Sequence, residues 1–146
     1  MGQQQLLTIL LGLVLVVVAV LLGIEAFTEN AKKSNADALI KDGMDIALAA
    51  QSWMLTPRML GGGGGSCDER CNWSLITFDA LGYRRGTGGS YENVHGIFFL
   101  DGLSRSSNLY VIGMNREYGN RVLLTVRGLG PGRISSQVQD MSLPGR

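Results

Sequence analysis

The feature that most constrains this chain is an uncharged apolar stretch close to its N-terminus, from Leu6 to Ile24. Its nineteen residues are Leu, Ile, Val and Ala, interrupted only by Thr8, Gly12 and Gly23. As an α-helix the stretch would extend roughly 28 Å, which matches the ~30 Å hydrocarbon thickness of a bilayer. A helix satisfies its own backbone hydrogen bonds in lipid. The stretch therefore predicts a helix that spans a membrane or is buried in an equally apolar environment.

A cleaved signal peptide is the alternative interpretation of this stretch. The five residues before it contain no Lys or Arg, and the apolar run is longer than the 7–15 residues of an ordinary signal-peptide core. No cleavage site with two small residues follows it; the chain continues as Glu25-Ala26-Phe27. We therefore expect the segment to be retained.

The next thirty residues read as a continuation of the same helix. Residues 25–54 contain no Pro and one Gly, and most are good helix formers. Apolar or small residues recur along them with 4-3-4-3 spacing, while charged residues lie on the other face. Such an amphipathic stripe needs a partner surface. Thr56-Pro57 is expected to end the helix. The residues of the stripe are Leu39, Gly43, Ile46, Ala50 and Trp53.

A glycine run and a pair of cysteines follow. Gly61–Gly65 predicts a flexible joint, and the alternative of a phosphate-binding loop lacks the Gly-Lys-Ser/Thr that should come after it. Cys67 and Cys71 could bind metal, attach haem or form a disulfide. Zinc needs two more ligands where the chain has one His, and haem attachment needs a two-residue spacing. A local disulfide in an oxidising compartment is the favoured interpretation, with free thiols as the alternative.

The remainder of the chain reads as β-structure. Residues 78–83 predict a helical turn that ends at Gly82, and Asp101-Gly102 predicts a turn. Alternating apolar residues mark strands, most clearly Val122, Leu124 and Val126. The four strand candidates are 91–100, 108–115, 121–127 and 133–139. Such a meander is antiparallel and leaves one face to be covered. We expect the helical stripe to cover it through Leu39, Ile46, Ala50 and Trp53.

Composition excludes several functions. Thirteen Lys and Arg against twelve Asp and Glu leave a net charge of +1, so no basic field for nucleic acid is present. The single histidine, His95, is expected to be an ordinary surface or turn residue. No nucleophile–base pair or paired-carboxylate arrangement is evident, so we expect no enzyme, no cofactor and no metal. The function of the chain is then expected to lie in assembly or binding.

These parts, in this order, resemble type IV pilins and pilin-like filament subunits. Gln3-Gln4-Gln5-Leu6-Leu7 at the start, the apolar half to Ile24 and the amphipathic half from Ala26 to Met54 carry the resemblance. It implies an α+β fold, with a long N-terminal helix packed on a small antiparallel C-terminal sheet. It also implies a subunit held in the inner membrane before assembly and in an extracellular filament afterwards. Counted from Met1, Gln5 stands where the family has a glutamate; it can accept a hydrogen bond from an N-terminal amine but cannot neutralise it.

The resemblance assigns roles along the whole chain. We expect residues 1–27 to form the membrane and filament-core helix, 28–56 its amphipathic continuation, 57–72 a Gly-rich loop with a short disulfide, and 73–146 a β-sheet head domain. The expected partners are other copies of the chain, the bilayer before assembly, and the pilus assembly machinery, with no specific nucleic acid. A single-pass anchored binding or signalling module is the alternative. The expected assembly residues are Met1, Gln5, Leu6, Leu10, Leu13, Val17, Leu21, Ile24 and Phe27.

Overall fold

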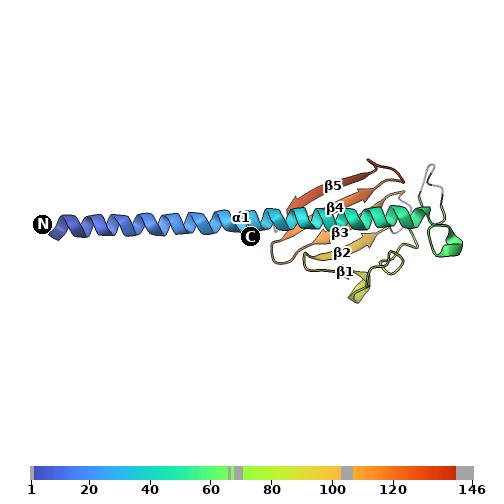
Figure 1. The fold of residues 1–146 in the computed structure, drawn as a ribbon, viewed down its shortest axis with the longest axis horizontal. Coiled ribbons are helices and arrows are strands. Elements are labelled where there is room, and N and C mark those ends of the chain that lie inside the picture. Colours follow the sequence, from blue (N-terminus) through green and yellow to red (C-terminus); the bar gives the residue numbers. More distant parts are fainter. Residues whose placement is uncertain (1, 66, 68–70, 103–106, 141–146) are drawn as a thin grey trace, which may run out of the picture. The chain divides into compact units, whose positions relative to one another are not determined.

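The computed structural model describes residues 2–65, 67, 71–102 and 107–140. One helix, α1 (Gly2–Leu55), is followed by five strands (Figure 1). The chain divides into two units, Met1–Ser34 and Asn35–Arg146, and α1 belongs to both. The helix ends one residue after the expected Met54, directly before Thr56-Pro57. The strands are β1 (Tyr91–Glu92), β2 (Ile97–Asp101), β3 (Leu109–Met114), β4 (Asn120–Val126) and β5 (Ile134–Asp140).

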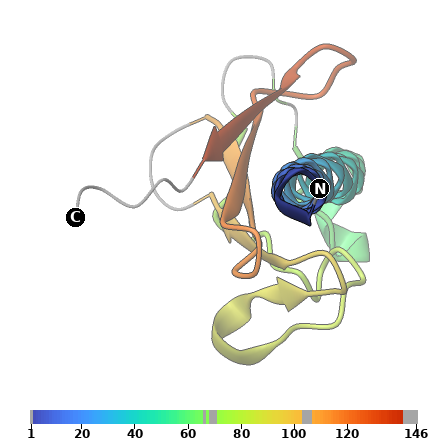
Figure 2. The same ribbon diagram turned by 90° about the vertical axis from the view of Figure 1, so that its left-hand side faces the viewer.

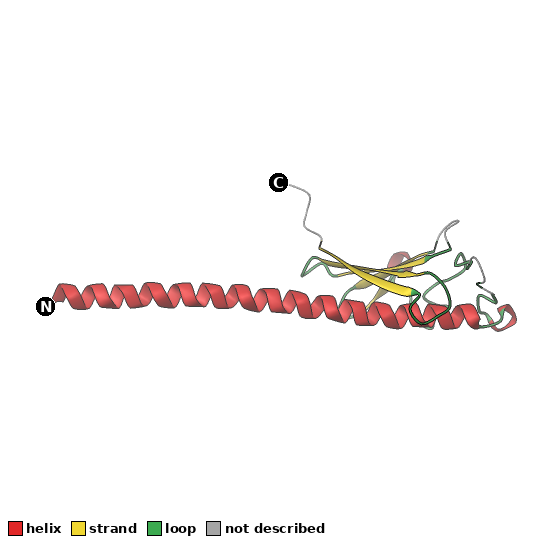
Figure 3. Cartoon of the chain, turned by 90° about the horizontal axis from the view of Figure 1, so that it is seen from above, coloured by secondary structure: helices red, strands yellow, loops and turns green. Residues whose placement is uncertain are grey.

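The five strands form one antiparallel sheet in the order β1-β2-β3-β4-β5, so each strand pairs with its neighbour in the chain. In the second unit the sheet is a single layer with α1 on one face (Figures 2 and 3). This confirms the α+β class and the antiparallel meander. The predicted strands 108–115, 121–127 and 133–139 are confirmed within one residue at each end.

The prediction of one strand over residues 91–100 is wrong. The chain turns after Glu92, and Asn93 holds the turn: its backbone N–H donates to the Gly96 carbonyl at 3.0 Å. Its side-chain Oδ1 also accepts the backbone N–H groups of His95 and Gly96, each at 3.0 Å. Asn side chains commonly stabilise turns in this way, and here the apolar pattern on both sides concealed it.

The helix-to-sheet core matches the predicted stripe. Leu39, Ile46, Ala50 and Trp53 are between 0% and 8% exposed. They share one buried cluster with strand residues that alternate on the facing side of the sheet. Burying each large aliphatic side chain contributes about 1.5–3 kcal/mol. The strand residues of the cluster are Phe98, Leu109, Val111, Val122, Leu124 and Val126.

Gly43 explains how closely the helix approaches the sheet. A methyl group placed on Gly43 would overlap Cδ1 of Leu124 in β4. Gly113, in the neighbouring strand β3, is likewise in contact with Phe98, since a Cβ there would lie 2.8 Å from its ring. Small residues at these two positions therefore let larger side chains fill the core.

The loop before the sheet completes the core. Trp73 and Phe78 are each 1% exposed, and the Trp73 indole N–H donates to the Ser107 carbonyl at 3.1 Å. The predicted helical turn at residues 78–83 is confirmed, because the Tyr83 N–H donates to the Phe78 carbonyl at 2.9 Å and Gly82 adopts φ 81°. The loop is thus an ordered part of the second unit.

The glycine run is not a flexible joint, which corrects the prediction. Gly61–Gly65 folds back over the end of α1: the Gly63 N–H donates to the Trp53 carbonyl at 3.0 Å, and the Gly64 N–H donates to the Thr56 carbonyl at 2.8 Å. A Cβ on Gly63 would lie 2.7 Å from Sδ of Met54. Glycine is required here because the backbone itself lies against the helix end and satisfies its last carbonyls.

The predicted disulfide is confirmed: Cys67 is bonded to Cys71. Cys71 is 6% exposed and belongs to the core cluster, while Cys67 packs against that cluster. The bridge therefore fastens the chain that follows the glycine run to the core of the second unit.

Candidate assembly surface

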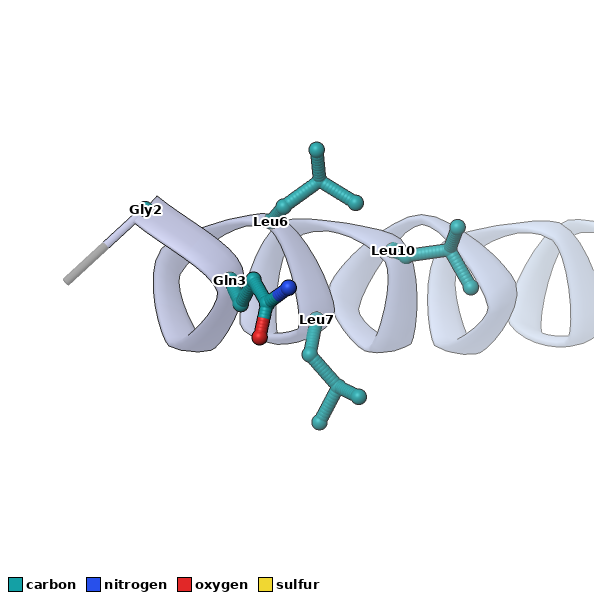
Figure 4. Close-up of a pocket in the computed structure, with 5 residues that line it drawn as sticks. All are labelled: Gly2, Gln3, Leu6, Leu7 and Leu10. Carbon is teal, nitrogen blue, oxygen red and sulfur yellow. The ribbon is translucent and has the colours of Figure 1, made fainter.

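The apolar half of α1 is exposed on every side. Between Leu6 and Ile24 each large apolar side chain is 47–71% exposed, and Phe27 is 76% exposed. Leu6, Leu7 and Leu10 project outward from the first turns (Figure 4). The helix is long and apolar enough to span a membrane, judged by length and composition. Exposure on this scale marks a surface that needs lipid or protein around it, because soluble proteins rarely leave large apolar patches in water.

The predicted assembly residues from Gln5 to Phe27 lie on the exposed N-terminal part of α1. They follow one another along α1 at helical spacing and form one stripe of it. Side chains outside the stripe, such as Leu7, Leu15 and Leu22, are equally exposed. A partner can therefore cover the helix from any direction. The exposed residues of the predicted stripe are Gln5, Leu6, Leu10, Leu13, Val17, Leu21, Ile24 and Phe27; Met1 lies outside the described residues.

Two threonine hydroxyls, one in the apolar half and one just after it, are satisfied within the helix. The Thr8 hydroxyl donates to the Gln4 carbonyl at 2.9 Å, and the Thr28 hydroxyl donates to the Ile24 carbonyl at 2.8 Å. A hydroxyl bonded four residues back does not require water. These two residues therefore leave the surface compatible with lipid or with a dry contact between helices.

Charged residues begin directly after the apolar half. Glu29 and Lys33 form an i,i+4 ion pair at 2.9 Å with both side chains exposed. The hydrogen bond from Lys33, with its positive charge, holds the pKa of Glu29 below its usual value. An exposed pair of this kind adds little stability, but it marks where α1 is suited to water.

A polar cluster joins α1 to the turns of the sheet, and sequence reasoning missed it. His95 lies in the β1–β2 turn, as expected, but its Nδ1–H donates to Asp42 Oδ2 at 2.6 Å. Asn93 Nδ2 donates to the same oxygen at 2.7 Å. The His95 carbonyl accepts hydrogen bonds from Asn35 at 3.2 Å and Asn115 at 2.6 Å. The cluster fastens α1 to two turns of the second unit.

The hydrogen bonds of this cluster hold the turns of the sheet on α1. Its amide groups are engaged with backbone and side-chain partners. Within the described ranges, no three His, Cys, Asp or Glu side chains gather where they could hold a metal ion. No short-range motif predicts these contacts, because Asp42 and His95 are 53 residues apart in the chain.

Comparison of the chain with protein-family models found no match. Comparisons with curated proteins and with solved structures also found none.

Proposed function

We propose that this protein is a structural subunit that polymerises through the apolar half of α1 into an extracellular, type IV pilus-like filament. The exposure of every large apolar side chain from Leu6 to Ile24 carries the proposal. Each of the larger aliphatic side chains gains about 1.5–3 kcal/mol when it leaves water. Outside lipid, packing against copies of the same helix covers this surface on all sides.

The confirmed disulfide supports the location of the second unit in this proposal. Disulfides persist in oxidising compartments, outside the cytoplasm. The Cys67–Cys71 bridge is part of the core of the second unit, so that unit is suited to the extracytoplasmic side. The apolar half of α1 is then held in the bilayer before assembly and leaves it for the filament. Heterologous contacts that do not close on themselves extend such a stack into a filament.

Electron microscopy of material sheared from the native cells tests the proposal. Filaments that contain this chain are expected, and Leu10→Glu or Leu13→Glu should abolish them because each places a charge in the apolar contact. Ser34→Glu, an exposed position on the same helix, is the matched control and should leave the yield unchanged. Normal filament yield from the Leu10 and Leu13 variants would contradict the proposal.

A single-pass anchored binding module is the second candidate, because α1 is long and apolar enough to span a membrane. Under that function the chain stays with the membrane fraction and no filament contains it. The same shearing experiment therefore separates the two functions.

A further inference from the structure

Further exposed apolar side chains lie at the C-terminal end of α1, and neither the predicted assembly residues nor the sheet core includes them. Leu48 is 51% exposed and Leu55 is 66% exposed. Met59 and Leu60, in the short 3-10 turn Arg58–Leu60 that follows, are 98% and 76% exposed. We call these four residues the helix-end patch.

The backbone that carries the four patch residues is held by the helix and by hydrogen bonds of the following turn. Leu48 and Leu55 are seven residues apart and therefore lie on the same side of the helix. Pro57 and the glycine run hold the residues that follow: the Leu60 N–H donates to the Pro57 carbonyl at 2.9 Å, and the Trp53 indole N–H donates to the Gly61 carbonyl at 3.0 Å. The backbone of this segment is therefore folded, and its apolar side chains remain exposed.

The part of α1 that carries Leu48 and Leu55 has no charged residue over a long stretch. No charged residue occurs from Ile46 to Pro57. Arg58, between Leu55 and Met59, is exposed and charged, and its Nε donates to the Gly63 carbonyl at 3.2 Å. Upstream on the exposed side of α1, by contrast, Lys41 and Asp45 are charged. The change from charged to neutral along one exposed helix side indicates that the neutral end meets an apolar partner.

We infer that the helix-end patch docks the apolar half of α1, Leu6 to Ile24, from a second copy of the chain. That segment is the largest exposed apolar surface among the described residues, it is uncharged, and it is helical. Within the patch, the uncharged side chains of Leu48 and Leu55 lie along one helix side. This spacing suits another neutral helix, which packs its side chains between theirs. This inference rests on the proposed filament and names a second surface that receives the same segment.

Substitution in the native cell tests the docking. Leu55→Glu is expected to lower the yield of sheared filaments about ten-fold, since it puts a charge against an apolar helix. Leu75→Glu, the same substitution at a side chain that is 72% exposed but lies outside the patch, is the matched control and should change the yield little. Unfolding of the two variant chains in mild detergent, read from Trp53 and Trp73, should match the wild type, which shows that the variants fold. Wild-type yield from Leu55→Glu and Leu48→Glu would overturn the docking but leave the proposed filament standing. A wild-type chain that forms no filaments would instead refute the filament.

Crosslinking identifies the occupant directly. Leu55→Cys and Leu10→Cys chains, made together, should yield crosslinked pairs in filaments, whereas Leu75→Cys, which is also exposed but lies outside the patch, should not pair with Leu10→Cys. The thiol introduced by Leu55→Cys should react with a water-soluble maleimide in the unassembled chain and be protected in filaments. Protection of that thiol already in the membrane-inserted chain would show that lipid covers the patch and would overturn the inference.

Discussion

The two halves of α1 have the same secondary structure and opposite surroundings. From Leu6 to Ile24 the large side chains are at least 47% exposed, whereas Leu39, Ile46 and Ala50 in the second half are at most 1% exposed. The second half packs against the sheet of its own chain, whereas the large side chains of the first half are exposed. The two halves therefore differ in burial and not in helix propensity: the second half is buried against its own sheet, and the first half is left exposed.

Deletion of the same leucine side chain in each half should give the largest contrast in stability. Leu39→Ala removes a fully buried side chain and should lower the free energy of unfolding of the second unit by about 2–5 kcal/mol. Leu13→Ala, at a side chain that is 63% exposed, should leave that free energy unchanged. Urea unfolding of the full chain in mild detergent measures both, because Trp53 and Trp73 both report from the second unit. Equal losses would show that the two halves are not independent.

The glycines of the two halves sharpen the same comparison. Gly43→Ala should destabilise the second unit by about 1–3 kcal/mol, because the added methyl overlaps Leu124. A Cβ on Gly12 has no atom within 4 Å, so Gly12→Ala should leave the unfolding of the second unit unaltered. Tryptophan fluorescence during denaturation again measures the difference. A Gly43→Ala chain as stable as the wild type would contradict the close approach of α1 to β4.

The polar cluster predicts a smaller effect. Asp42→Ala removes the acceptor of both His95 and Asn93 and should cost about 1 kcal/mol. Asp37→Ala, at an exposed position earlier in the same helix, is the control and should be neutral. The same unfolding measurement distinguishes them. If the two variants were indistinguishable, the cluster would contribute nothing to holding the turns on α1.

The smallest expected effect is a dependence of stability on alkaline pH. Burial, followed by the charge of Asp45, raises the pKa of Tyr83 above its ordinary value of 10.0. The folded chain then keeps a proton that the unfolded chain has lost. This stabilisation is complete below pH 10.0 and decreases as the pH rises through the folded pKa. Tyr83→Phe keeps the ring contact with Tyr91, at 4.9 Å between centroids, and should flatten the alkaline slope. An unchanged slope would contradict this role of Tyr83.

Much of the fold follows from local pattern. The apolar run, the 4-3-4-3 stripe and Thr56-Pro57 predict α1 and its end, and the alternation of Val122, Leu124 and Val126 predicts β4. A helix with one buried face repeats its apolar residues every three or four positions, and a strand with one buried face repeats them every second position. The disulfide was also predictable, since the spacing of Cys67 and Cys71 does not fit haem attachment and the chain has too few further ligands for zinc.

What the sequence did not reveal depends on contacts between distant residues. Composition alone predicts a flexible glycine run, yet the carbonyls at the end of α1 give its N–H groups partners. The Asp42–His95 hydrogen bond joins residues 53 apart. The helix-end patch emerged only once the fold showed that Leu48 and Leu55 point away from the sheet core, while Ile46 and Ala50 point into it. Local patterns indicate which side chains are apolar, but not which of them the fold leaves exposed.

Sedimentation of the purified full chain after complete removal of detergent tests the central claim most directly. The exposed apolar half of α1 should drive the chain into long assemblies that sediment rapidly and are visible as filaments by negative-stain electron microscopy. A chain that stays monomeric and soluble in plain buffer, with Leu6 to Ile24 still helical, would contradict the account.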